Sequence, residues 1–309
     1  MTITILGTGT LGAALAREFT SRDIATRTVS RGEPSGQIPP GVGHTRADAT
    51  NEAALTAALA GSTVVVHTAQ PAYQRWEHEF PALQRSIVNA AAAVGAKLVI
   101  ADNLYMYGEG DGGVITDGTA ERPCSLKGRV RKAMADEALA AHADGRLEVV
   151  LTRPSNYVGA GYALTQELLL KPARGAKPMK VLGAIDQPHS FSYVPDVARA
   201  MADIALASDA YGRAWVLPSL SPITQRELCD ALWSAVGNAG PAKIQALRGL
   251  GARAIGLFNA PLRASVEMMY EFEKPFISQA TDFEKRFGWS ATPAADALRA
   301  TAAVTVPAN

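Results

Sequence analysis

Three glycines near the start of the chain have the spacing of a loop that can hold phosphate groups. The run Gly7-Thr8-Gly9-Thr10-Leu11-Gly12 follows an expected strand, Thr2–Leu6, and precedes an expected helix at 13–19. Gly7 can take the tight turn, Gly9 removes a Cβ that would block phosphates, and Gly12 lets the helix approach the strand. The helix N-terminus then faces the negative charge. The run predicts a site for a dinucleotide pyrophosphate, the alternative being a turn that only links two elements.

The residues after the second expected strand bear on which dinucleotide binds. An NAD site usually places Asp or Glu about 20 residues beyond the glycines, where the carboxylate accepts hydrogen bonds from ribose hydroxyls. This chain has Val29-Ser30-Arg31-Gly32 there. A 2′-phosphate meets no repelling carboxylate and can be bound by the Arg31 guanidinium and the Ser30 hydroxyl. We therefore expect NADP rather than NAD, unless Arg31 is only a solvated loop residue.

Composition limits the classes of function. The 309 residues are 48% apolar, enough for one elaborated domain or two, and 30 Lys and Arg offset 29 Asp and Glu without a dense basic stripe. Small molecules are thus better expected partners than nucleic acid or membranes. Cys124 and Cys229 are too few for a disulfide framework, which fits a reducing compartment. Without room for a leader before Thr2, and without a run of about 18 apolar residues, cytoplasm is the expected location.

Strand and helix patterns alternate through the first half of the chain. After the first helix, expected strands lie at 25–30, 43–47, 63–68, 96–101 and 147–152, and expected helices at 52–60, 75–94 and 130–143. Such alternation predicts an α/β, doubly wound parallel sheet, a Rossmann fold, with ligands at the carboxyl ends of the strands. We assign 1–153 to this domain. Residues 154–309 are expected to form mainly a smaller substrate-binding lobe, with segments near 191–217 able to return to the main domain.

Four further segments, in order, resemble motifs of the extended short-chain dehydrogenase/reductase family of NAD(P)-dependent epimerases and dehydratases. They are 64–69, 153–161, 191–198 and 283–293. The resemblance implies that the cofactor is also contacted by Asp48, Ala49, Thr68, Ala69, Gln70, Pro154 and Asn156. Only one residue separates Gly7 from Gly9, where the family usually has two. That spacing is closer to the atypical branch of the family, in which catalytic residues are often altered.

The proton-transfer pair of the resembled family is missing. That family places Tyr and Lys four residues apart on one helix face, to exchange a proton with the substrate and hold the nicotinamide ribose. The corresponding stretch, 122–131, has Lys127 and Arg131 at this spacing. Arginine does not release its proton near neutral pH, and lysine does so only when desolvated or crowded by positive charge. The two cations have two possible roles, and the sequence does not decide between them. They either bind the ribose or a phosphate of the cofactor, or they are solvated side chains at the start of a helix.

Two residues after the fifth expected strand are the alternative candidates for catalysis. Asn103 stands where the family keeps its substrate-binding Ser or Thr, and an amide can donate a hydrogen bond to a carbonyl. Tyr105 is the candidate for a displaced phenol acid, the alternative being an aromatic wall of the pocket. The predicted catalytic set is therefore Tyr105, Asn103 and Lys127, with no metal.

Two functions remain, since the chain has no Gly-x-Ser-x-Gly elbow, no Walker loop and no two-His zinc helix. The first is an NAD(P)-dependent oxidoreductase or epimerase/dehydratase-like enzyme acting on a small carbonyl or hydroxyl compound. The second is a catalytically silent NADP(H)-binding sensor or regulator. We favour the enzyme. The resemblance also implies a homodimer formed through the helices at 75–94 and 130–143.

Overall fold

The computed structural model describes residues 1–34, 37–249 and 260–304. Within them the chain divides into two compact units, each made from several stretches of sequence. The first unit comprises Met1–Met106, Leu126–Arg153 and Val197–Leu217, and the second comprises Tyr107–Ser125, Pro154–Asp196 and Pro218–Asn309.

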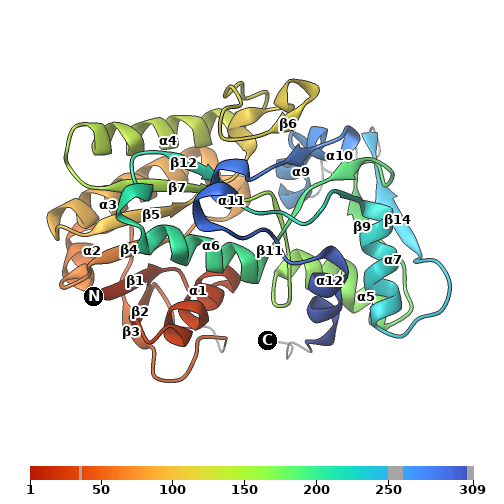
Figure 1. The fold of residues 1–309 in the computed structure, drawn as a ribbon, viewed down its shortest axis with the longest axis horizontal. Coiled ribbons are helices and arrows are strands. Elements are labelled where there is room, and N and C mark those ends of the chain that lie inside the picture. Colours follow the sequence, from red (N-terminus) through yellow and green to blue (C-terminus); the bar gives the residue numbers. More distant parts are fainter. Residues whose placement is uncertain (35–36, 250–259, 305–309) are drawn as a thin grey trace. The chain divides into compact units, whose positions relative to one another are not determined.

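The first unit is built on a seven-stranded parallel sheet (Figure 1). In spatial order the strands are β12 (Ala214–Val216), β7 (Val149–Arg153), β5 (Lys97–Ala101), β4 (Val64–His67), β1 (Thr2–Leu6), β2 (Ala25–Ser30) and β3 (Gly43–Arg46). Every neighbouring pair runs parallel. The order reverses direction beside β1, as in a doubly wound Rossmann sheet. The predicted fold class is therefore confirmed.

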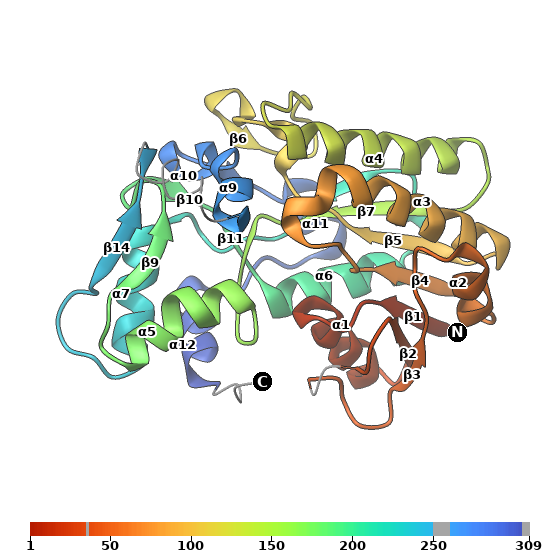
Figure 2. The ribbon, with the colours of Figure 1, turned by 180° about the vertical axis from the view of Figure 1, so that it is seen from behind.

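Helices on both faces bury the sheet (Figure 2). One layer consists of α2 (Glu52–Leu59), α3 (Trp76–Ala93) and α4 (Leu126–Ala143), and α1 (Thr10–Ser21) and α6 (Val194–Leu206) cover the other face. The first layer packs Phe80, Ile87 and Ala138 into one apolar core with Leu98 and Leu151 of the sheet. On the second face, Arg22 at the end of α1 binds Asp203 of α6 at 2.7 Å. Strand residues outside the first core, such as Ile3, Val66 and Val99, are also fully buried, as expected for apolar strands of a parallel sheet covered on both faces.

Helix α4 begins earlier than the sequence pattern predicts. We expected a helix from residue 130, but it starts at Leu126 and includes Lys127 and Gly128. Lysine followed by glycine gives no apolar helical pattern, and glycine disfavours a helix interior by about 1 kcal/mol relative to alanine. Both residues are buried, so tertiary packing overrides the local preference.

The second unit has short paired strands and its own core. The parallel pairs are β8 (Asn156–Val158) with β11 (Phe191–Tyr193), β9 (Met179–Leu182) with β14 (Ile244–Leu247), and β6 (Val114–Ile115) with β15 (Ile277–Ser278). Strands β10 (Pro188–His189) and β13 (Ile223–Thr224) pair antiparallel. The helices include α5 (Lys171–Arg174), α7 (Gln225–Ala235), α9 (Ala260–Val266), α10 (Tyr270–Glu273), α11 (Thr281–Phe287) and α12 (Ala294–Ala303). Its core joins Leu228 and Trp233 of α7 to Leu298 of α12. In the described part of the chain, no helix combines the length and apolar character needed to cross a membrane.

Candidate functional site

Packing explains two of the three glycines in the loop after β1. Gly7 has φ +105°, and a Cβ there would lie 2.8 Å from Oγ1 of Thr68. A Cβ on Gly12 would lie 2.1 Å from the carbonyl oxygen of Gly7. Both distances are shorter than atoms can approach without a shift. A larger residue at Gly7 would displace the loop from the end of β4, and a larger residue at Gly12 would displace α1 from the loop. These glycines hold the turn against the sheet.

Gly9 has a different role, because no atom of the described residues lies within 4 Å of a Cβ built there. Gly9 is also the N-cap of α1, with no side chain capping the helix and no acidic residue in its first turn. The amides and the positive end of the helix dipole are therefore compatible with a bound phosphate. Thr8, Thr10 and Leu11 are half-buried around this turn, and the geometry fits a pyrophosphate.

The predicted nucleotide-selecting residues lie at the ends of β2 and β3. Arg31 is exposed, and the Ser30 hydroxyl donates to the carbonyl of Gly32 at 2.9 Å. Asp48 accepts hydrogen bonds from the amide and hydroxyl of Thr50, and these bonds, aided by the positive charge of Arg31, lower the pKa of Asp48. Ala49 follows, half-buried. Arg31 and Asp48 thus share one neighbourhood with the end of β2.

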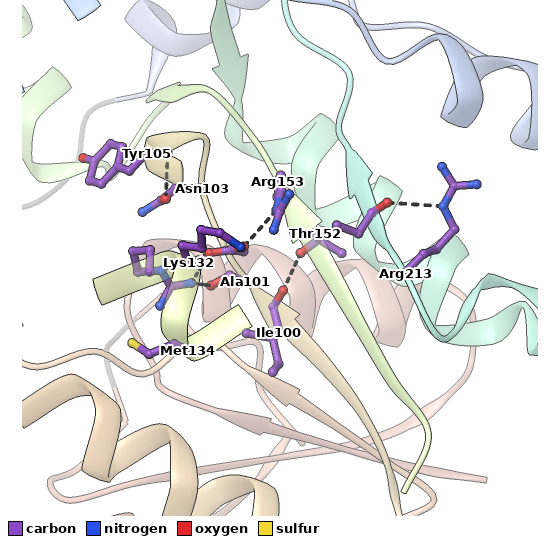
Figure 3. Close-up of polar contacts among 12 residues, drawn as sticks. Ile100, Ala101, Asn103, Tyr105, Lys132, Met134, Thr152, Arg153 and Arg213 are labelled. Carbon is purple, nitrogen blue, oxygen red and sulfur yellow. Dashed lines mark hydrogen bonds and ion pairs between the residues drawn. The ribbon is translucent and has the colours of Figure 1, made fainter. Parts of the chain in front are cut away.

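Asn103 and Tyr105 lie beyond the carboxyl end of β5, as Figure 3 shows. The side-chain oxygen Oδ1 of Asn103 accepts a hydrogen bond from the backbone amide of Tyr105 at 3.1 Å. This bond orients the amide group, because Oδ1 is committed to the turn and Nδ2 is left as a donor. Asn103 is half-buried. A donor of this kind can polarise a substrate carbonyl.

A second phenol, which our sequence analysis missed, lies beside Tyr105. The hydroxyl of Tyr73 donates to the hydroxyl of Tyr105 at 3.2 Å. Nζ of Lys127 lies over the Tyr73 ring, 4.6 Å from its centroid, and Lys127 is only 7% exposed. Trp76 packs edge-on to Tyr73 at 4.9 Å between ring centroids. The only signal in the sequence was an aromatic residue six positions after the end of β4.

Arg131 is held in a buried ion-pair cluster. Its Nε and Nη2 donate to Oδ1 of Asp102, and Nη2 also donates to the carbonyl of Ala101. Nε of Arg153 donates to Oδ2 of Asp102 at 3.0 Å. Phe80 covers the guanidinium of Arg131, 4.7 Å from the ring centroid. Solvated cations at a helix start, one of the two alternatives, are therefore wrong for both Lys127 and Arg131. Arg131 binds Asp102 and cannot serve as an acid.

The remaining predicted cofactor residues divide between the two units. Thr68, Ala69 and Gln70 follow β4 in the first unit, where Oγ1 of Thr68 donates to the carbonyl of Leu6 at 2.9 Å. Pro154, which is buried, and Asn156, which is half-buried, belong to the second unit. Their contact with a cofactor stays a prediction.

Comparison with known proteins agrees with this architecture. The model of the NAD dependent epimerase/dehydratase family matches residues 3–217. A relative from Arabidopsis thaliana, 3beta-hydroxysteroid-dehydrogenase/decarboxylase isoform 2, is 27% identical over 251 residues, which are 74% of this chain and 42% of that protein. The chain thus spans less than half the length of this curated relative.

Solved structures show the same fold. The dTDP-glucose 4,6-dehydratase from Bacillus anthracis str. Ames, in complex with NAD, superposes with a TM-score of 0.80 at 16% identity over 98% of this chain and 95% of that one. The UDP-glucose 4-epimerase from Thermus thermophilus, also with NAD, gives 0.79 at 17% identity over 98% of both.

The parallel sheet and the glycine turn after β1 define a Rossmann-type dinucleotide-binding fold. The chain belongs to the NAD dependent epimerase/dehydratase family, which confirms the resemblance found in the sequence.

Proposed function

We propose that the protein is an NADP-dependent oxidoreductase or epimerase/dehydratase-like enzyme acting on a small carbonyl or hydroxyl compound through a phenol other than the family's usual one. The observation that carries this proposal is the hydrogen-bonded pair Tyr73 and Tyr105 with Lys127 beside it. The two phenols follow β4 and β5, and the glycine turn follows β1, which pairs with β4. Because these strands are parallel, their carboxyl ends share one edge, where ligands of such sheets bind.

In this proposal, each residue of the candidate site has its own role in the reaction. When bound, NADP(H) supplies or accepts the hydride. Nδ2 of Asn103 donates a hydrogen bond to the substrate oxygen and stabilises the negative charge that develops there. Tyr105 transfers its proton to that oxygen, and Tyr73 donates its own to Tyr105, so the second phenol replenishes the first. The ammonium of Lys127 over the Tyr73 ring favours negative charge on that phenol.

Single-turnover absorbance of bound NADPH tests this function. We expect oxidation by at least one member of a panel of aldehydes, ketones and enones. Tyr105→Phe should slow that step at least tenfold, about 1.4 kcal/mol of barrier, while leaving NADPH affinity unchanged. Tyr73→Phe is the matched control and should have the smaller effect, since it leaves the donating phenol in place. Equal rates for Tyr105→Phe and the unaltered protein would assign Tyr105 to the pocket wall.

The preference for NADP is supported by the exposed Arg31 and by the lack of an Asp or Glu at positions 29–32, where β2 ends. NADPH should raise the melting temperature more than NADH at equal concentration. Arg31→Ala should remove that difference, because a charge-assisted bond to a phosphate needs the guanidinium. Equal shifts for the two cofactors in the unaltered protein would contradict the proposal.

A sensor without turnover is the second candidate, and the Asp102 and Arg131 pair favours it. The position of the family's catalytic lysine is occupied by a guanidinium tied to a carboxylate. Tight NADPH binding with no oxidation across the panel would establish this function. Sugar nucleotides, which the structural neighbours' names specify for those proteins, belong in the panel. A homodimer through α3 and α4, and a cytoplasmic location, complete the proposal.

A further inference from the structure

A layer of polar side chains covers the apolar core of the first unit at the carboxyl ends of its strands. Three neighbouring strands each place one apolar residue in the core shared with α3 and α4: Val65, Ile100 and Leu151. Alternate residues of a strand point to the same face. The residues two positions further on continue these rows, and all three are polar and buried: His67, Asp102 and Arg153. Arg131 of α4 reaches the same layer, because it binds Asp102.

His67 is the member of this layer whose hydrogen bonds the protein does not supply. It is 1% exposed, and neither ring nitrogen has a hydrogen-bond partner among the residues that the structure describes. Burial, together with the charge of Arg131, lowers the pKa of His67 to about 3, so the ring is neutral at pH 7. A neutral imidazole has one N–H donor and one nitrogen lone pair. Burying such groups without partners costs free energy.

One nitrogen of Arg131 is in the same situation. Nε and Nη2 donate to Asp102 and to the carbonyl of Ala101, but the buried Nη1 has no acceptor within the described ranges 1–34, 37–249 and 260–304. The ring centroid of Phe80 lies 4.7 Å from Cζ of Arg131 and 6.2 Å from the centroid of the His67 ring. Two buried side chains with unmet hydrogen-bonding capacity therefore lie against one aromatic ring.

The donors and acceptors of these two side chains define the ligand that fits them. Nη1 of Arg131 only donates, so the ligand must accept, and the lone pair of His67 only accepts, so the ligand must also donate. An anion cannot donate and would leave that lone pair unmet. A metal cation cannot accept and is repelled by the guanidinium. A small hydroxylic molecule meets both requirements, and water is the usual partner of such buried groups.

We propose that His67 and Arg131 bind a buried water molecule, which accepts a hydrogen bond from Nη1 of Arg131 and donates one to a ring nitrogen of His67. His67 is the last residue of β4. The water thus connects the carboxyl end of this strand to α4 through Arg131. The site lies within the first unit and is independent of the proposed function, since a chain without turnover would bind the same water.

A crystal structure of the unaltered full chain tests the site without any variant. Ordered solvent density should lie within hydrogen-bonding distance of both Nη1 of Arg131 and one ring nitrogen of His67. Crystals soaked in bromide should show no anomalous peak at this position. A bromide peak there would identify an anion site, and a map without solvent density would leave both groups unmet. Either result overturns the inference.

Oxygen-17 relaxation dispersion of water tests the same site in solution, because it detects water molecules that stay inside the protein longer than it tumbles. His67→Phe removes both ring nitrogens and should lower the dispersion amplitude by the contribution of about one water molecule. His78→Phe is the matched control, since the side chain of His78 is 79% exposed, and it should leave the amplitude unchanged. An unchanged amplitude in His67→Phe would contradict the proposal.

The sign of a stability change gives an independent readout. If His67 had no partner at all, His67→Phe would remove a buried unmet group and raise the melting temperature. With water bound, the same change leaves Nη1 of Arg131 without an acceptor, and the melting temperature should fall by about 2 to 4 °C. His67→Gln keeps a donor and an acceptor and should lose less. A rise in His67→Phe, or equal losses in the two variants, would refute the bridging water.

Discussion

Each of the two units buries a carboxyl group, and the two carboxyl groups differ in whether a positively charged side chain lies beside them. In the first unit Asp102 lies between the guanidinium groups of Arg131 and Arg153, and all three side chains are at most 2% exposed. In the second unit the carboxyl of Glu271 accepts a hydrogen bond from the side-chain amide of Asn156, with no cation among the described groups that interact with it, and burial raises its pKa to about 8. Burial alone therefore does not decide whether a carboxyl is charged. The presence of a buried counter-charge does.

Asp102→Asn should have the largest effect on stability, because it removes the carboxylate that distinguishes the first cluster from the second. The change keeps the shape of the side chain but removes the carboxylate to which both buried guanidinium groups donate. Removing one partner of a buried ion pair typically costs about 3 to 5 kcal/mol of unfolding free energy. Urea unfolding followed by circular dichroism measures this loss. A change below about 1 kcal/mol would mean that water or a neighbouring group compensates the two cations, and that the pairing is not what maintains the cluster.

The second test uses the dependence of stability on pH. Below its unfolded pKa of 4.5 the carboxyl of Glu271 is protonated in both states. As the pH rises, the unfolded chain loses this proton first, while the native state keeps it up to about pH 8, so native stability falls through this window. Between pH 5 and 7.5 the loss is roughly 3 kcal/mol at 1.36 kcal/mol per pH unit.

Glu271→Gln should remove this part of the decline. The measurement is the unfolding free energy of both proteins at several pH values, read as their difference. The difference between the two proteins is needed because His67 and His189 also make stability depend on pH. Burial lowers their pKa values to about 3 and about 4, so at acid pH the native state binds protons less readily than the unfolded chain. Parallel pH profiles for the two proteins would show that Glu271 is ionised in the native state.

The smallest expected effect comes from an exposed pair on the same helix as Arg131. Lys132 and Asp136 are one turn apart, 3.0 Å between Nζ and Oδ1, with side chains 36% and 58% exposed. Lys132→Ala should change the unfolding free energy by no more than about 0.5 kcal/mol, because solvent screens the pair. A loss as large as that of Asp102→Asn would show that helix α4, rather than the buried cluster, is what these substitutions disturb.

The sequence predicted the first unit well because its signals are local. The glycine turn and the helix that follows are contiguous, and each buried strand is a short apolar run, so neighbouring residues suffice to place them. Asn103 and Tyr105 could be named because they follow such a strand. The start of α4 could not, since Lys127 and Gly128 are helical only in the packed protein.

Contacts between distant segments could not be predicted in the same way. Tyr73 meets Tyr105 across 32 positions, and Asn156 meets Glu271 across 115. Nothing in the short stretch around Glu271 distinguishes it from a solvated acid on a helix. Its protonation depends on burial and on the absence of a cation nearby, and both are properties of the assembled unit.

The sequence by itself determined the Rossmann sheet and the glycine turn at Gly7, Gly9 and Gly12, because residue type and short-range spacing encode these features. Only the tertiary structure decided that Arg131 is bound to Asp102, that Tyr73 joins Tyr105, and that Glu271 is bonded to Asn156. The reason is physical. Hydrogen-bond direction and protonation state depend on which groups are brought together away from water, and folding alone brings them together.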